Sequence, residues 1–177
     1  MNGLISGAHV HLLVNHAPIF GALFGLALLG ASFVWAPDVL RRASFVVLIG
    51  TAIASGVADV SGDPAEDAIR GFPGVQRALI HTHEGFAEKS FIVAGIVGFL
   101  ALVALIKWRR GIIPRGVSAG MLVAAAIVSG MMVYTGLLGG RIRHSEVRPG
   151  ATPADATTIE PPRARPGAPE GPPALTR

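Results

Sequence analysis

The sequence predicts an all-α integral membrane protein: an up-down four-helix bundle with an extracytoplasmic loop and a Pro-rich C-terminal tail. Three observations predict it. Apolar residues make up 51% of the 177 residues and charged residues only 15%, whereas soluble domains carry about 25% charged residues. Four uncharged runs approach bilayer length, and each ends at a charged residue or a proline. These runs lack the polar face that a soluble amphipathic helix presents to water.

The four runs are the expected membrane-spanning helices, surrounded by the lipid bilayer. A helix needs roughly 20 residues to cross about 30 Å of hydrocarbon. The first and fourth runs reach this length unaided, and the second and third need a few flanking residues. The runs are Ala17–Trp35, Ala43–Ala58, Ser90–Ile106 and Gly116–Gly140.

Two polar segments complete the expected organisation. The connection 59–89 contains turn signals, and Pro64–Arg70 is expected to form a short helix with Asp63 as its N-cap. Eight of the thirteen prolines lie at or after Pro149, and such a composition favours an extended or disordered chain. We therefore divide the chain into a four-helix transmembrane domain, 1–140, and a Pro-rich tail, 141–177.

The placement of basic residues predicts the orientation. Four crossings put both termini on one side. No basic residue precedes the first run, whereas Arg41 and Arg42 follow it, and the flanks of the first helix usually dominate the positive-inside rule. The short loops are thus expected in the cytoplasm, and the termini on the extracytoplasmic side of the cell inner membrane.

Several functional classes are disfavoured by what the chain lacks. It has no cysteine, so thiolate metal sites, Cys nucleophiles and covalent c-type haem are excluded. No nucleophile with a base, phosphate loop or cofactor fingerprint indicates an enzyme. The low charge content excludes a nucleic-acid-binding domain. A transporter site would require a charged residue inside a membrane-spanning run, and none of the four runs contains one.

All six histidines are expected at one face of the membrane. They flank the starts of the first and third runs and the end of the fourth. These histidines are His9, His11, His16, His81, His83 and His144. His16 lies about twenty residues before the Trp35 end of its helix, and His83 about twenty-four before the Lys107 end, so both are expected at similar depth.

Depth-matched imidazoles on diagonal helices can hold iron between them, as in other helical bundles. We predict His16 and His83 as ligands of a haem b or, alternatively, of a bare copper or iron ion, because imidazole suits both metals. His11, Asn15, His81 and Glu84 are expected to support the site, whereas Glu66 by itself is expected to be a loop residue. The competing interpretation is that interfacial histidines only anchor the helices, and for His9 and His144 we adopt it.

Glycines recur along the runs, among them Gly21, Gly25, Gly98 and Gly136. Small residues allow close helix packing in lipid. Alternatively, the missing side chains leave room for a flat porphyrin. Close packing is the favoured interpretation.

Three ordered motifs also carry a family resemblance. They are His11–Ile19 (HLLVNHAPI), Gly62–Glu66 (GDPAE), and Pro73–Val75 followed by His83 and Glu84. They resemble the motifs of an uncharacterised family of bacterial four-helix membrane proteins, filed as a domain of unknown function. The likeness covers about residues 9–140, with Ala17 in place of the family's common Phe. It implies a four-helix fold and recurrent polar positions at His11, Asn15, His16, Glu66, His83 and Glu84, and so adds Glu66 to the supporting residues. It implies no particular reaction, although members of the family are thought of as redox or haem-associated proteins.

Two functions follow as hypotheses. The first is a haem b- or metal-binding electron-transfer component on the extracytoplasmic side. The second is a non-catalytic accessory subunit of a larger respiratory or photosynthetic membrane complex, which the Pro-rich tail would contact as a strap. The two are compatible, since a subunit can also hold haem.

Overall fold

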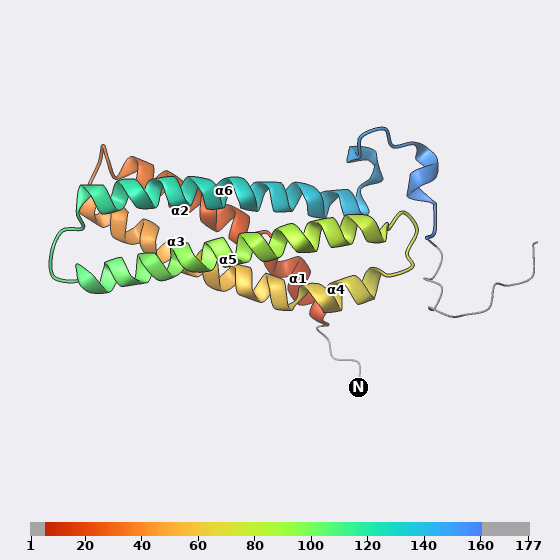
Figure 1. Ribbon diagram of the computed structural model, residues 1–177, viewed down its shortest axis with the longest axis horizontal. Helices are drawn as coiled ribbons and strands as arrows, with labels where there is room; N and C mark the ends of the chain where they lie inside the picture. Colours follow the sequence, from red (N-terminus) through yellow and green to blue (C-terminus); the bar gives the residue numbers. More distant parts are fainter. Residues whose placement is uncertain (1–5, 161–177) are drawn as a thin grey trace, which may run out of the picture.

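The computed structural model describes residues 6–160. In this part of the chain the regular elements are helices joined by short connections, and there is no strand. Four long helices form a bundle: α2 (Ala17–Ala31), α3 (Pro37–Val60), α5 (Arg77–Lys107) and α6 (Arg115–Arg143). Two short helices, α1 (Gly7–Val14) and α4 (Gly62–Ile69), lie at one end (Figure 1). Two 3-10 turns, η1 (Ser145–Val147) and η2 (Pro153–Ala156), follow α6.

Four helical segments are long and apolar enough to cross a membrane, as predicted. They are Gly7–Ala31, Asp38–Ile69, Arg77–Lys107 and Arg115–Arg143. Large apolar side chains cover the outside of the bundle; Phe20 and Phe24 of α2, for example, are 67% and 60% exposed. A continuous apolar exterior is unfavourable in water, so this surface is compatible with a multi-pass membrane protein.

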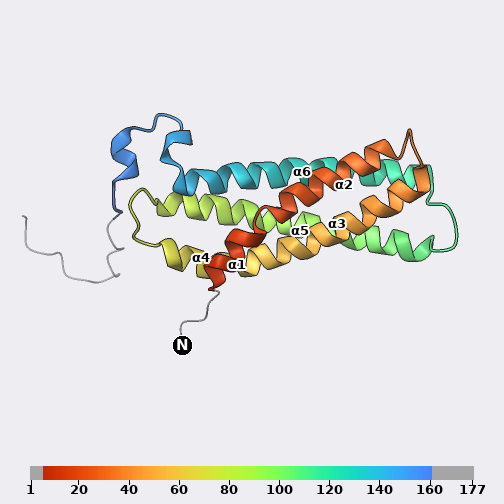
Figure 2. The same ribbon diagram turned by 180° about the vertical axis from the view of Figure 1, so that it is seen from behind.

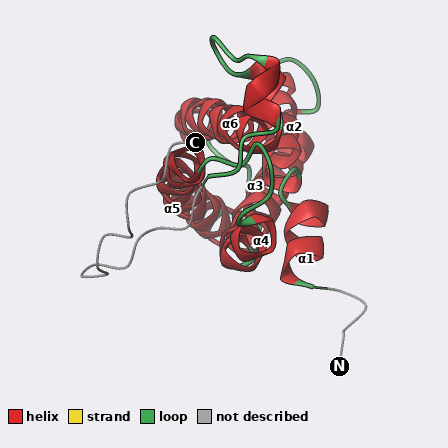
Figure 3. Ribbon diagram, turned by 90° about the vertical axis from the view of Figure 1, so that its right-hand side faces the viewer, coloured by secondary structure: helices red, strands yellow, loops and turns green. Residues whose placement is uncertain are grey.

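The four long helices alternate in direction around the bundle. α2 packs against α3 and α6, and α5 packs against the same two helices. Viewed from the end in Figure 3, α2 and α5 occupy opposite corners. The first and third long helices are therefore diagonal, as predicted.

The bundle core combines a few large apolar residues with many small ones. Phe45, Leu29 and Leu48 are buried among alanines of α5 and α6. A Cβ on Gly98 would lie 2.5 Å from the Cβ of Ala52 in α3. Side chains of neighbouring helices thus occupy the space that such glycines leave, which supports close packing over a porphyrin cavity there.

The connection 59–89 is more helical than the sequence predicted. α5 begins at Arg77, well before Ser90, because its first turns are amphipathic: Ile80 is buried with Ile142 and Val75, while His81 faces outward. The short helix α4 begins at Gly62 with Ser61 at its N-cap, so the prediction of Asp63 as N-cap is wrong.

The N-terminal span is broken at residues 15–16. α1 ends at Val14 and α2 begins at Ala17, with Pro18 in its first turn. Pro18 has no N–H to donate to the Val14 carbonyl oxygen, so the hydrogen-bond ladder is interrupted there although Asn15 and His16 keep right-handed helical backbone angles. Figure 2 shows α1 angled away from α2 and lying over α4 and the end of α3.

Part of the predicted tail is folded onto the bundle. α6 continues to Arg143, beyond the expected boundary at 140. Arg148 donates hydrogen bonds to the carbonyl oxygens of Arg141 (2.7 Å) and Gly74 (2.7 Å), and the Gly74 N–H donates to Thr158 (2.8 Å). Residues 144–160 therefore close over the loop before α5 through backbone bonds that composition does not reveal. Residues 161–177 of the tail lie outside the described residues.

Candidate functional site

The histidine end of the bundle, formed by α1, α4, the start of α5 and the end of α6, carries all six histidines. The connections 32–36 and 108–114 close the opposite end (Figure 1). The prediction that the histidines gather at one end is confirmed.

His83 is a half-buried residue of α5 held against α6. Its Nδ1 lies 3.1 Å from the carbonyl oxygen of Thr135. The imidazole also lies beside Gly139, where a Cβ would come within 3.1 Å of Cε1. Gly139, one turn after Thr135, has no side chain, and the His83 ring occupies the space beside it.

His11 makes the equivalent contact from α1 to α3. Its Nδ1 lies 3.0 Å from the carbonyl oxygen of Ala58 and 3.3 Å from the hydroxyl oxygen of Ser61. These bonds fasten α1 to the last turn of α3.

The partners of His11 and His83 determine which ring nitrogen carries the proton. A backbone carbonyl can only accept a hydrogen bond, so Nδ1 is the donor in each ring. In the neutral imidazole, Nε2 then carries a free lone pair, the form in which histidine binds a metal. In both rings the main chain therefore orients the imidazole and leaves Nε2 as the unprotonated nitrogen.

His16 has a different environment. It is exposed at the break before α2, and its Nδ1 is hydrogen-bonded to the Oδ1 of Asn15, its neighbour in the chain. The predicted support of His16 by Asn15 is thus a direct contact. His16 is hydrogen-bonded to Asn15 and His83 to Thr135, so no described hydrogen bond brings the two predicted ligands together.

The predicted acidic residues meet beside α4. The carboxyl groups of Glu66 on α4 and Glu84 on α5 are close enough to interact. Glu84 also accepts from the Nδ1 of His81 at 3.3 Å, and Glu66 accepts from Arg70 at 3.1 Å. Glu66 and Glu84 thus connect α4 to α5 at the histidine end.

The two histidines interpreted as structural have local roles. His9 completes a capping box with Ser6 at the start of α1. The Nδ1 of His144 lies 2.8 Å from the Oε1 of Glu146. The N–H of Glu146 itself, and then His144, hold the pKa of the Glu146 carboxyl below its ordinary value.

Thr135 and Ser61 are the site residues that the sequence did not single out. Thr135 also joins α6 to α5 through its hydroxyl, which lies 2.9 Å from that of Ser90. Ser90 is seven residues after His83, on the same helix face. The signal in the sequence was that Thr135 and Ser90 are small hydroxyl residues in otherwise apolar runs, where such side chains can form hydrogen bonds between helices.

Within residues 6–160, no three His, Asp or Glu side chains lie close enough together to hold a metal ion. Comparison with protein-family models, with curated proteins and with solved structures finds no match to this chain. The family resemblance and the cofactor therefore stay predictions.

Proposed function

We propose that this chain is a small membrane protein that holds a b-type haem at its histidine end and takes part in electron transfer. What supports the proposal is the shared state of His11 and His83: the Nδ1 of each donates to a backbone carbonyl, which leaves Nε2 free to bind iron. Bound haem would supply one-electron redox chemistry.

The chain's own residues would hold and orient the group. We assign His83 as one ligand and His11 as the other, because the main chain leaves the Nε2 of both rings free. His16, which the sequence favoured, is the alternative second ligand. Asn15 contacts His16 directly, Glu84 contacts His81 within α5, and Glu66 of α4 interacts with Glu84.

The donor set favours haem over a bare copper or iron ion. A bare ion takes most of its ligands from protein side chains, and no three candidate side chains converge among the described residues. A porphyrin supplies its own nitrogens and needs only one or two axial imidazoles.

The proposed location is the cell inner membrane, with both termini on the extracytoplasmic side. The support is the absence of basic residues before the first span and the presence of Arg41 and Arg42 after it. The histidine end would then face the extracytoplasmic side, within reach of a soluble redox partner.

An absorbance spectrum tests the proposal. Protein purified in detergent from cells supplied with a haem precursor should show a Soret band. The variants His83→Ala and His11→Ala should lose it, and His16→Ala should keep it if His11 is the second ligand. His144→Ala, which removes an exposed imidazole bound to Glu146, is the matched control. Absence of a Soret band and of bound iron or copper, with helical circular dichroism intact, would refute the proposal.

A role as an accessory subunit of a larger membrane complex is the second proposal. Val147 and Ile159 are 57% and 60% exposed in the segment after α6, outside the spans that lipid would cover. Exposed apolar side chains in an aqueous zone favour a protein partner. Migration of the gently solubilised protein on a native gel as a monomer or homodimer would count against this role.

A further inference from the structure

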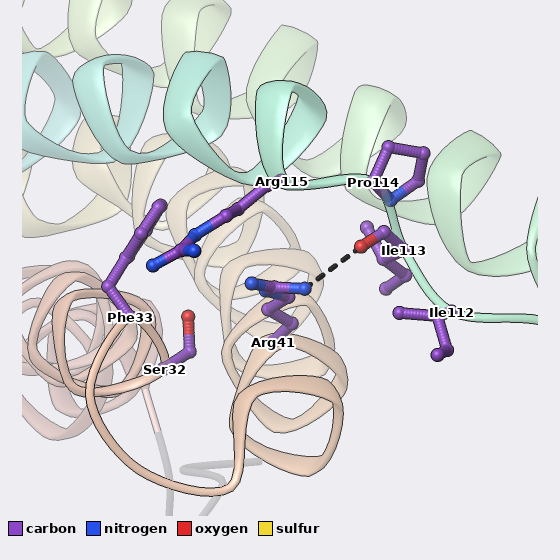
Figure 4. Close-up of a pocket in the computed structure, with 7 residues that line it drawn as sticks. All are labelled: Ser32, Phe33, Arg41, Ile112, Ile113, Pro114 and Arg115. Atoms are coloured by element: carbon purple, nitrogen blue, oxygen red, sulfur yellow. Dashed lines mark hydrogen bonds between the residues drawn. The ribbon is translucent and has the colours of Figure 1, made fainter.

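A cavity of about 440 Å³ lies at the end of the bundle opposite the histidines. The end of α2, the start of α3 and the connection before α6 surround it (Figure 4). Its lining includes Ser32, Phe33, Arg41, Ile113 and Arg115. Two of these are cations, and none is an acid.

Arg41 is buried there with unused hydrogen-bonding capacity. Arg41 is only 5% exposed. Nη1 donates to the carbonyl oxygen of Ile113 at 3.0 Å, but the buried Nε has no partner. Burying a guanidinium without a counter-charge is costly, so an anion at this position would stabilise the structure.

The neighbouring carboxylate is already engaged. Asp38 accepts from the Nε of Arg42 at 2.7 Å through one oxygen and from the N–H of Ile113 at 3.1 Å through the other. Among residues 6–160, no carboxylate forms an ion pair with Arg41 or Arg115. Both oxygens of Asp38 are thus engaged by Arg42 and Ile113, and Asp38 interacts with Arg41 through charge alone, without a hydrogen bond.

Arg115 brings a second positive charge to the same space. The guanidinium carbons of Arg41 and Arg115 lie 5.8 and 5.9 Å from the centre of the Phe33 ring. Figure 4 shows both side chains directed toward the space beside this ring. A cation–π contact offsets only part of the cost of desolvating a charge, and two guanidiniums repel each other unless an anion lies between them.

The backbone adds to this preference for an anion. Arg115 is the first residue of α6, and Pro114 at the N-cap offers no side-chain cap. The first N–H groups of a helix have no partner within it, and they carry the positive end of the helix dipole. Anionic groups, phosphates among them, bind at such ends.

From these observations we propose that the cavity binds a phosphate group, held by the buried Arg41, by Arg115 and by the start of α6. Guanidinium groups bind phosphate through paired charge-assisted bonds. A phospholipid headgroup and free inorganic phosphate share this chemistry. The apolar lining of Phe33 and Ile113, and the exposed Trp35 nearby in sequence, suit a lipid at the membrane interface.

Native mass spectrometry of delipidated protein in detergent tests the proposal. Phosphatidylglycerol and a diacylglycerol with the same acyl chains serve as probes, since they differ only in the phosphoglycerol group. Phosphatidylglycerol should be retained and diacylglycerol should not. Arg115→Ala and Arg41→Met should each weaken retention about tenfold, which is the effect of losing one charge-assisted contact. Arg110→Ala, an exposed cation in the same connection, should leave it unchanged.

A second measurement separates the two sources of phosphate and covers a variant that fails to fold. Thermal unfolding of the delipidated protein is compared in phosphate and in chloride at equal ionic strength. If phosphate raises the unfolding temperature more than chloride does, and Arg115→Ala removes this rise, free phosphate is a ligand. If the lipid is retained but phosphate causes no such rise, the ligand is the lipid headgroup. The proposal is overturned if neither effect appears, or if Arg110→Ala weakens retention as much as Arg115→Ala.

Discussion

The Nδ1 of His83 lies 3.1 Å from the carbonyl oxygen of Thr135, so a side chain of α5 is oriented by the main chain of α6. The bond determines the tautomer of His83 and makes its Nε2 available. It also joins two adjacent helices at the end where the proposed cofactor binds.

Gly139→Ala should displace the His83 ring. The added Cβ would meet Cε1 at 3.1 Å, closer than carbon atoms pack without adjustment. We expect a changed Nδ1 signal in spectra of ¹⁵N-histidine-labelled protein and, if haem is bound, a severalfold loss of the Soret band.

Gly140→Ala is the matched control for this variant, because a Cβ there has no atom within 4 Å. Equal spectra for both variants would contradict the close contact between Gly139 and His83.

His11→Ala should loosen α1. The variant removes the bonds from His11 to Ala58 and Ser61, whose loss costs about 1 kcal/mol. Hydrogen exchange over residues 7–14 should become roughly five- to tenfold faster, while α6 is unaffected.

Leu13→Ala truncates a side chain of α1 that is 77% exposed and serves as the control for His11→Ala. Similar exchange in both variants would mean that His11 does not anchor α1.

Gly98→Ala should destabilise the bundle. Its Cβ would lie 2.5 Å from that of Ala52, and overpacking a tight interface costs about 1–3 kcal/mol. Thermal unfolding in detergent should show a lower midpoint than in wild type.

Gly95→Ala, one turn earlier on the same helix, meets nothing within 4 Å. It should be neutral or stabilising by up to about 1 kcal/mol, since alanine has the higher helix propensity. A midpoint for Gly98→Ala at or above that of Gly95→Ala would argue against the packing of α3 on α5.

The turn η2 should depend on pH. Asp155 accepts hydrogen bonds from the Thr152 N–H at 2.6 Å and its hydroxyl at 2.8 Å. These bonds hold the pKa of Asp155 below its ordinary value of 3.8. Because the folded pKa is the lower one, the stabilisation is complete above pH 3.8 and is lost as the pH falls through the folded value.

A ¹³C titration of the Asp155 carboxyl should therefore give a midpoint below 3.8. Thr152→Val removes the hydroxyl donor but keeps the N–H, so the midpoint should move part of the way back. A wild-type midpoint at or above 3.8 would mean that the turn is not formed.

Local pattern was sufficient for the four spans and for the gathering of the histidines at one end. Uncharged runs of bilayer length and the alternation of helix direction do not depend on distant contacts. The helical start of α5 was missed because its polar residues suggested a loop, although Ile80 packs on Ile142 from α6. The folded segment after α6 was missed because Arg148 binds main-chain oxygens that have no signature in composition.

Which side chains meet was decided by tertiary structure alone. Chain order placed His11, His16 and His83 at one end, but the rotation and height of each helix brought His11 to Ala58 and His83 to Thr135 and left His16 exposed. Arg41 is an unremarkable loop-flanking cation in the chain and a buried, incompletely bonded one in the fold. Both outcomes depend on contacts across more than forty residues, which helix periodicity cannot encode.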